Sequence, residues 1–251
     1  MNPQSSEMQG AVSSSGEDEA AAAIQQMFSS IAPRYDLLNH LLSLNVDRLW
    51  WRRAARAFAP IVQRPGARIL DLCCGTGEMA FALAKVRGAG NAEITGCDFS
   101  APMLALARRK SARIQNPPSW LQADALSMPL PGAGFDLVVS AFGFRNLASY
   151  DRGLREIARV LKSGGEIGIL EFSRPSGALG RLYSFYFGRI LPRIGAAISG
   201  VRGPYEYLPA SVARFPSPPE MLERMRAAGF RDANWTPYTF GVAGLFRAIR
   251  A

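Results

Sequence analysis

The chain has 251 residues, of which 48% are hydrophobic and 20% are charged, as in a globular protein with a substantial core. No apolar run reaches the roughly 18 residues that a membrane-spanning helix needs, and the N-terminus lacks the basic and apolar segments of a secretory signal. We therefore expect a cytoplasmic protein. The formal net charge of +9 leaves nucleic acid and an anionic membrane surface open as partners.

Histidine and cysteine content excludes several kinds of site. His40 is the single histidine, so neither a histidine-rich metal site nor a Ser-His-Asp triad is expected. Cys73, Cys74 and Cys97 fall on predicted buried strands, and we interpret them as free thiols in a reducing compartment. The sequence therefore predicts no metal centre.

The N-terminal part divides into a tail and a helical cap. Residues 1–20 are mostly Ser, Gly, Glu and Ala, a composition that predicts a disordered tail. Apolar residues at helical spacing predict helices over residues 21–60, with breaks at Pro33 and Asn45. Because these helices precede the first strand, we expect them to cap a cofactor cleft in a single domain covering residues 21–251.

The stretch from Arg68 to Ala80 combines a short apolar strand, a glycine turn and the start of a helix. Gly75 and Gly77 let the backbone approach a ligand without a Cβ atom in the way. They also fit the dinucleotide fingerprint loosely, so an NAD(P)-dependent oxidoreductase is one alternative. Asp71, before the glycines, suits a ligand with an ammonium group better than a pyrophosphate. The pattern Asp-x-x-x-Gly-x-Gly resembles motif I of class I S-adenosylmethionine-dependent methyltransferases.

Other polar residues extend this site along the chain. Asp98 ends the next strand about 20 residues after the turn, where a carboxylate can accept both ribose hydroxyls of either cofactor. Asp124 follows the third strand and can accept from an adenine amino group, or can cap a turn or helix. Phe99 can pack against the adenine or the core. The expected S-adenosylmethionine site comprises Asp71, Gly75, Thr76, Gly77, Asp98, Phe99, Asp124, Ala125 and Ala141.

From Arg68 onward, predicted strands and helices alternate, which indicates parallel strands joined by crossover helices. The strands are expected near 68–74, 93–98, 119–122, 135–141 and 166–172, and the helices near 78–87, 102–114 and 149–162. Residues 173–214 then interrupt the alternation as a long insertion.

The C-terminal part predicts how the sheet ends. A helix begins at Ser217-Pro-Pro-Glu220, and the strands Asn234–Thr239 and Val242–Ile249 follow it. The short loop at Phe240-Gly241 predicts a hairpin, so the last strand runs antiparallel to its neighbour. We therefore expect an α/β, Rossmann-like class I methyltransferase fold with strand order 3-2-1-4-5-7-6. A dinucleotide dehydrogenase would instead repeat the nucleotide-binding half.

Further motifs make the resemblance more specific than motif I alone does. They lie at Phe28–Asn39, Ala141–Asn146, Leu161–Gly165, Leu170–Ser173, Leu191–Gly195 and Tyr205–Ser211. Together they resemble the quinone-biosynthesis C-methyltransferases, the family of demethylmenaquinone methyltransferases and 2-methoxy-6-polyprenyl-1,4-benzoquinol methylases. The chain departs from this family at Ala141, where many members have Ser. It departs again at Gly244-Leu245-Phe246, where the usual pattern is Ala-Leu-His.

The resemblance implies methyl transfer to a ring carbon of a reduced quinone that carries an isoprenoid tail. Demethylmenaquinol is the expected substrate, and the benzoquinol of the ubiquinone pathway is the alternative. Arg145 is the candidate for stabilising the phenolate, with Asn146 and Tyr35 hydrogen-bonding the ring oxygens. A water molecule or Asp36 would take the proton. The alternatives are a salt-bridging role for Arg145, and helix packing and capping for Tyr35 and Asp36.

The insertion suggests a second function. Residues 174–202 include five arginines and no acid, among many large apolar residues. This mixture suits a membrane interface better than a nucleic-acid groove. We expect the segment Arg181–Pro192 to line a channel for the isoprenoid tail and to hold the protein at the inner face of the membrane. The alternatives are extra core or a contact between two copies of the chain. A basic RNA methyltransferase is a further alternative, which predicts strongly salt-dependent nucleic-acid binding.

Overall fold

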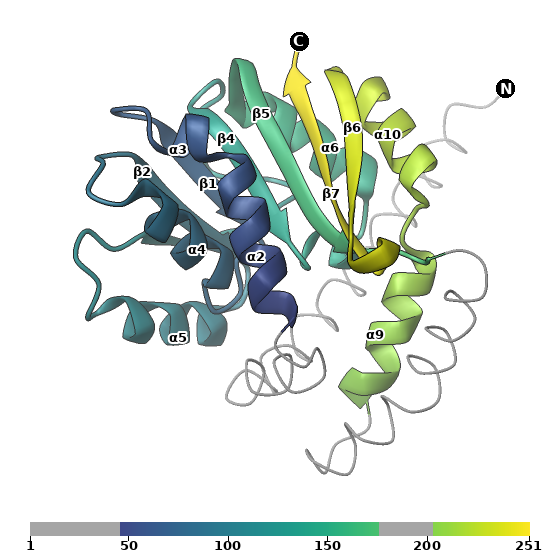
Figure 1. The fold of residues 1–251 in the computed structure, drawn as a ribbon, viewed down its shortest axis with the longest axis horizontal. Coiled ribbons are helices and arrows are strands. Elements are labelled where there is room, and N and C mark those ends of the chain that lie inside the picture. The colour runs from purple at the N-terminus through teal and green to yellow at the C-terminus, as the bar shows by residue number, and fades with distance from the viewer. Residues whose placement is uncertain (1–45, 176–202) are drawn as a thin grey trace, which may run out of the picture.

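The computed structural model of the protein describes residues 46–175 and 203–251, which form one seven-stranded sheet with helices on both faces (Figure 1). The strand order is β3-β2-β1-β4-β5-β7-β6. Strands β1 to β5 are parallel, whereas β7 is antiparallel to both β5 and β6. This confirms the order and the antiparallel end that the sequence predicts. The tail, the residues of the cap before 46, and residues 176–202 of the insertion lie outside the described residues.

Several predicted elements match the structure closely. The strands are β1 (Arg68–Leu72), β2 (Glu93–Asp98), β3 (Ser119–Gln122), β4 (Phe135–Ala141), β5 (Leu161–Phe172), β6 (Phe230–Tyr238) and β7 (Ala243–Arg250). The helices are α2 (Val46–Ala57), α3 (Ala59–Val62), α4 (Glu78–Arg87), α5 (Ala101–Ser111), α6 (Tyr150–Val160), α9 (Gly203–Arg214) and α10 (Pro218–Ala227), with 3-10 turns η1 (Phe144–Asn146) and η3 (Thr239–Gly241). The described end of the insertion is therefore the helix α9.

Strand β5 begins at Leu161, five residues before the predicted start, and α6 ends at Val160. Leu161 already pairs with Phe135, and the register then shifts before the next pair along β4. Gly164, with a φ of +76°, lies inside this irregular stretch. In a sequence, a glycine that follows a helical pattern indicates the end of the helix. Here the glycine belongs to a bulged strand.

Two cores hold helices against the two faces of the sheet. On one face, α2, α3 and α4 bury apolar side chains against β1, β2 and β4, and α2 contributes Trp50, Trp51 and Ala54. On the other face, α6 and α10 pack through Leu154, Ile157 and other apolar residues against β4, β5 and β7. Figure 1 shows α2 lying across one face and α6 behind the opposite face. The described part of the cap thus packs directly on the sheet.

The cysteine loop differs from its prediction. Cys97 lies on β2, but Cys73 and Cys74 follow β1 instead of belonging to it. Cys73 has a φ of +54°, which a strand does not accept, so pairing stops at Leu72. All three cysteines are free thiols. Burial, as the largest cause, raises the pKa of Cys97 to about 12, which makes this thiol a poor nucleophile.

Gly77 supports the fold as well as the predicted approach of a ligand. It has a φ of +91°, and a Cβ atom added there would lie 2.5 Å from the ring of Trp120. The same ring lies against Gly96, where an added Cβ atom would be 2.4 Å away. Trp120 on β3 therefore fills the space that two glycines leave open.

Replacing Gly77 with alanine is expected to lower the free energy of unfolding by about 2–4 kcal/mol, because a left-handed residue and an overpacked ring both cost stability. Gly75 is the matched control, since its φ is +53° but an added Cβ atom meets nothing within 4 Å. Gly75→Ala should cost only about 1–2 kcal/mol. Denaturant unfolding of both variants checks this, and equal losses would mean that Trp120 is not the cause.

In residues 46–175 and 203–251, no helix combines the length and the apolar character needed to cross a membrane.

Candidate active site

The carboxyl ends of four neighbouring strands meet at one edge of the sheet and carry most of the predicted site. Leu72 of β1 pairs with Cys97 of β2, and Ala141 of β4 pairs with Leu170 of β5. The loops that leave these strands therefore emerge side by side. This is the edge where open α/β sheets bind their ligands.

Asp98 organises the glycine turn. Its Oδ2 atom accepts from the backbone N–H of Gly75 at 2.8 Å, and its Oδ1 atom accepts from the N–H of Ser100 at 2.9 Å. A hydrogen bond of 3.0 Å from Cys74 N to Cys97 O ties the same loop to β2. Burial, as the largest cause, raises the pKa of Asp98, while these N–H donors oppose the shift. Each carboxylate oxygen can accept a further hydrogen bond.

Asp71 lies under the first turn of α4. Its side chain is completely buried, and its Oδ2 atom accepts from Ala80 N at 2.8 Å. In the described part of the chain its Oδ1 atom has no hydrogen-bond partner. Burial raises the pKa of Asp71 to about 8, and the nearby Asp98 adds to the shift. A cationic group that reached the Oδ1 atom would lower this pKa and would satisfy the buried oxygen.

The high pKa of Asp71 predicts a pH dependence of stability. The unfolded carboxyl group ionises near its ordinary value of 3.8, whereas the native group keeps its proton up to about 8. The native state therefore binds more protons between these values, so the contribution of Asp71 to the free energy of unfolding falls as the pH rises from about 4 to about 8.

Asp71→Asn should remove this fall, because an amide does not titrate. Denaturant unfolding of wild type and variant from pH 4 to 9 measures the difference, and the variant should gain stability relative to wild type as the pH rises. A difference that stays constant with pH would show that Asp71 is ionised in the native state throughout.

Thr76 is buried in the turn and is held from the side by a lysine. Lys110, near the end of α5, donates to Thr76 Oγ1 at 3.0 Å and to Glu78 Oε1 at 2.7 Å. Residues 75–77 are therefore fixed by a carboxylate on one side and by an ammonium group on the other. The backbone N–H groups of Gly75 and Gly77 are used within the fold, since they donate to Asp98 Oδ2 and to Cys74 O at 2.9 Å.

The predicted adenine contacts are less buried. Phe99 is half-buried and Ala125 is buried, whereas Asp124 is exposed. Asp124 Oδ1 accepts from Leu126 N at 2.9 Å, which is the turn-forming role that was the alternative for this residue. Ala123 N donates to Asp98 O at 3.1 Å and so places this turn beside the end of β2.

Arg145 and Glu171 form a buried ion pair at the same edge of the sheet, which is the salt-bridging role that was the alternative for Arg145. Arg145 follows β4 in η1, Glu171 lies near the end of β5, and their side chains are 5% and 0% exposed. The Nη1 atom of Arg145 lies 3.3 Å from Oε1 and 3.2 Å from Oε2 of Glu171, and it also donates to Phe142 O. Burial raises the pKa of Glu171, whereas the Arg145 charge lowers it. A charge this deep persists because its partner compensates it.

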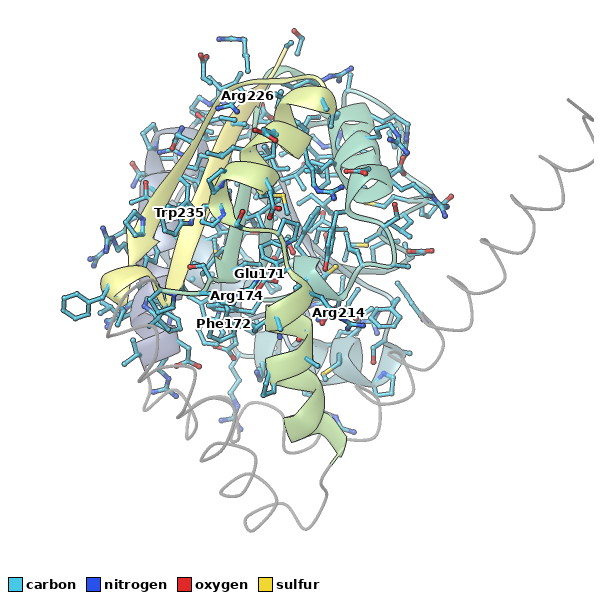
Figure 2. The ribbon with its side chains drawn as sticks, turned by 90° about the vertical axis from the view of Figure 1, so that its right-hand side faces the viewer. Glu171, Phe172, Arg174, Arg214, Arg226 and Trp235 are labelled. Atoms are coloured by element: carbon cyan, nitrogen blue, oxygen red, sulfur yellow. The ribbon has the colours of Figure 1, made fainter. Side chains whose placement is uncertain are left out.

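Strained backbone and aromatic rings surround the pair. Phe142, directly after Ala141, has a φ of +58°, and the adjacent Gly143 could not accept a Cβ atom, which would lie 2.4 Å from Cys73 Cβ. The ring centroids of Phe142 and Phe172 are 4.6 Å apart, and the guanidinium of Arg145 lies 5.6 Å from the Phe172 ring centroid. Figure 2 shows Glu171 and Phe172 near α9, far from Arg226 at the other end of the sheet.

Most of the predicted residues in the described ranges thus lie at this edge, including Asn146, which is half-buried in η1. Tyr35 and Asp36 lie outside the described residues. Sequence reasoning assigned no role to Glu171 or Lys110. An acid at the end of an apolar strand is the signal that could have singled out Glu171, whereas nothing in the local sequence points from Lys110 to Thr76.

Comparison with known proteins gives a consistent result. The model of the ubiE/COQ5 methyltransferase family matches residues 15–250. A demethylmenaquinone methyltransferase of Deinococcus radiodurans is 50% identical over 225 residues, which cover 89% of this chain and 91% of the relative. That of Thermus thermophilus is 49% identical over 87% of this chain and 97% of its own length. A ubiquinone/menaquinone biosynthesis C-methyltransferase of Geobacter sulfurreducens is 44% identical, covering 91% and 88%.

Solved structures agree on the fold. An S-adenosylmethionine-dependent methyltransferase of Thermotoga maritima, described as a possible histamine N-methyltransferase, superposes with a TM-score of 0.64 at 20% identity, covering 90% of this chain and 99% of that one. The [4+2]-cyclase SpnF superposes with a TM-score of 0.66 at 20% identity, covering 92% and 96%. At such identities the likeness concerns the fold alone.

Proposed function

Because this chain belongs to the ubiE/COQ5 methyltransferase family, we propose that it transfers the methyl group of S-adenosylmethionine to a ring carbon of demethylmenaquinol and so forms menaquinol. The relative from Deinococcus radiodurans carries the name of this activity at 50% identity. The oxidoreductase alternative loses its support, since the family is one of methyltransferases and the sheet ends in a hairpin instead of a second nucleotide-binding half.

The cofactor site follows from the residues at the sheet edge. Asp98 would accept from the ribose hydroxyls, residues 75–77 would lie against the methionine part of the cofactor, and Asp71 would face the ammonium group through its Oδ1 atom. Two observations indicate that the cofactor fits this site. The buried Asp71 Oδ1 atom has no hydrogen-bond partner among the described residues, and the space beside Gly75 is open. When bound, the cofactor supplies an electrophilic methyl group on a sulfonium. Phe99, Asp124, Ala125 and Ala141 would complete the site around the adenine.

The quinol that accepts the methyl group must be stabilised as its phenolate anion. A ring carbon becomes nucleophilic when a neighbouring hydroxyl ionises, and a phenol with a pKa near 10 costs roughly 4 kcal/mol to ionise at pH 7. Arg145 supplies a fixed positive charge in a buried setting, where a charge of this kind stabilises an anion most. Arginine keeps its proton in proteins, so it does not act as the base. Asn146 and Tyr35 would hydrogen-bond the ring oxygens, and a water molecule or Asp36 would take the hydroxyl proton. Once the methyl group had moved from sulfur to carbon, the ring carbon would lose its hydrogen as a proton and the hydroxyl would re-form, so that S-adenosylhomocysteine and one proton are released.

The contacts between Glu171 and Arg145 are the observation that supports the proposed role of Arg145 most strongly. Its carboxylate accepts from both the side chain and the backbone N–H of Arg145, the latter at 3.1 Å. A guanidinium held at two points has a fixed position, and a fixed donor needs no reorganisation when charge develops. A surface arginine would have neither the burial nor the second contact.

The substrate's tail and the membrane complete the proposal. The segment Arg181–Pro192 would line a channel for the isoprenoid chain, and the protein would work as a peripheral protein at the inner face of the membrane. A homodimer contact through the same insertion is the alternative.

Methyl transfer with a labelled cofactor tests the function. The purified chain is incubated with S-adenosylmethionine carrying a deuterated methyl group, together with demethylmenaquinol kept reduced. Mass spectrometry should find the label on a ring carbon of menaquinol. A methyl ether, or transfer to 2-methoxy-6-polyprenyl-1,4-benzoquinol with a higher kcat/KM, would contradict the assignment.

A further inference from the structure

Two large apolar side chains stand out among the described residues because solvent surrounds them. Leu49 on α2 is 55% exposed and Phe240 in η3 is 84% exposed. Other large apolar side chains of residues 46–175 and 209–251 are buried or half-buried. Single exposed apolar residues are common on soluble proteins. These two indicate a binding surface only if they lie close together.

Contacts hold together the two elements that carry these residues. The turn η3 lies on α2, since Trp50 Nε1 donates to Thr239 Oγ1 at 2.8 Å. The guanidinium of Arg53 lies 4.1 Å from the ring centroid of Tyr238, at the end of β6. Leu49 is one helical turn from Arg53 and is therefore its neighbour on the same row of α2. Leu49 and Phe240 thus flank a single junction between α2 and the β6–β7 hairpin.

The turn that carries Phe240 holds two residues other than glycine in a left-handed conformation. Thr239 has a φ of +46° and Phe240 a φ of +56°, values that favour glycine or asparagine. Gly241 O accepts from Ser173 Oγ at 2.7 Å, so the hairpin is fixed to the end of β5. The Phe240 ring is 84% exposed and therefore buries little apolar area against the described chain. Glycine there would relieve strain without losing a buried contact.

The exposed charges of α2 beside these residues have one sign. The exposed face of α2 carries Arg48, Arg52, Arg53 and Arg56, and the helix's one acid, Asp47, is buried. The opposite side of the molecule is different, because arginines there are mixed with acids. Around the depression between α6 and α10, for example, Arg224 pairs with Asp151 at 2.8 Å and Glu223 is adjacent.

We propose that the surface formed by Leu49, Phe240 and the exposed arginines of α2 docks on an anionic lipid bilayer, with the Phe240 ring in the interface. Basic residues would attract the negative surface, and the apolar side chains would enter the headgroup region.

The location supports this proposal. Trp50 links the surface to the site, since its ring centroid lies 5.8 Å from that of Phe142 and 5.9 Å from that of Phe172. Docking would therefore bring the edge that holds Arg145 close to the membrane. The benefit of this placement rests on the proposed function, because a lipid-tailed quinol resides in the bilayer. The binding itself does not depend on that function.

Vesicle flotation tests the surface directly. The full chain is mixed with vesicles of phosphatidylglycerol and phosphatidylcholine, or of phosphatidylcholine alone, without any quinol. Wild type should float with the anionic vesicles and should be released by high salt. Phe240→Gly should lower the partition coefficient about tenfold or more, while its thermal midpoint stays equal or rises. Phe240→Trp should keep the binding, and its fluorescence should change in the presence of anionic vesicles.

Charge variants provide the matched comparison. Arg48→Gln combined with Arg52→Gln should weaken binding to anionic vesicles by about fivefold for each charge removed. Arg155→Gln combined with Arg226→Gln removes the same charge from α6 and α10, on the other face of the sheet, and should change binding little. Equal losses in the two double variants, or unchanged binding by Phe240→Gly, would overturn the proposal.

Binding of nucleic acid, the other anionic partner, is tested in a parallel experiment. If a single-stranded RNA oligonucleotide binds through Arg48 and Arg52 while vesicles do not, the surface is not a membrane site. The test also stands apart from the enzymatic proposal. A chain that floats but does not methylate demethylmenaquinol would refute only the proposed function, and one that methylates but never floats would refute only the docking surface.

Discussion

Replacing Arg145 with methionine is expected to lower kcat for demethylmenaquinol methylation by about 10²–10³-fold. A preorganised charge that stabilises an anion in a buried site has typically this effect when it is removed. KM for S-adenosylmethionine should change little, because Arg145 lies after β4 whereas the predicted ribose contact, Asp98, is the last residue of β2. Steady-state kinetics with both substrates varied separates the two constants.

Loss of folding must be distinguished from loss of chemistry in that variant. Arg145→Met leaves Glu171 buried without its partner, which is expected to cost about 3–5 kcal/mol of stability. Adding Glu171→Gln removes the uncompensated charge and keeps an oxygen that can accept from the N–H of Arg145 or Phe172.

The double variant Arg145→Met/Glu171→Gln should therefore recover most of the stability but none of the activity. Recovery of both together would show that Arg145 serves the fold alone. Glu171→Gln by itself should reduce kcat less than Arg145→Met does, since the guanidinium remains while its orientation is less fixed.

Replacing Asp98 with asparagine is expected to weaken binding of S-adenosylhomocysteine by about 100-fold or more. Hydrogen bonds to a charged acceptor contribute about 1.5–3 kcal/mol each, and a ribose offers two hydroxyls. The same substitution turns an amide N–H₂ group toward Gly75 N or Ser100 N, which already donate to Asp98. The glycine turn should therefore loosen as well. Isothermal titration calorimetry measures the affinity.

Asp124→Asn is the matched control for this change of charge. Asp124 is exposed, and its Oδ1 atom accepts from Leu126 N, a role that asparagine can retain. The affinity should fall by no more than about fivefold, as for one hydrogen bond of ordinary strength. If the two variants bind S-adenosylhomocysteine equally well, Asp98 does not hold the ribose.

The fold was predictable to the extent that local pattern determines it. The bounds of β2, β3, β4 and α4 agree with the sequence expectation because apolar strands and glycine turns mark them. The start of β5 was predicted wrongly, since Gly164 resembles the end of a helix. The hairpin at Phe240-Gly241 was predicted, but the positive φ values of Thr239 and Phe240 and the hydrogen bond from Trp50 to Thr239 were not.

The candidate site was predictable in its residues but not in its pairings. Asp71 and Asp98 could be identified as the acids at the ends of two strands. The hydrogen bond from Ala80 to Asp71 depends on how α4 sits over β1, which no local pattern contains. Arg145 and Glu171 are 26 residues apart and become partners only because β4 and β5 are neighbours. Long-range ion pairs of this kind follow from topology and packing.

A crystal structure of the chain with S-adenosylhomocysteine would show whether the cofactor and Arg145 share one site. Both ribose hydroxyls should lie within hydrogen-bond distance of the Asp98 carboxylate, the amino group should lie at Asp71 Oδ1, and the sulfur should face a cavity that reaches Arg145. A ligand bound away from Asp98, or a sulfur separated from Arg145 by packed protein, would contradict it.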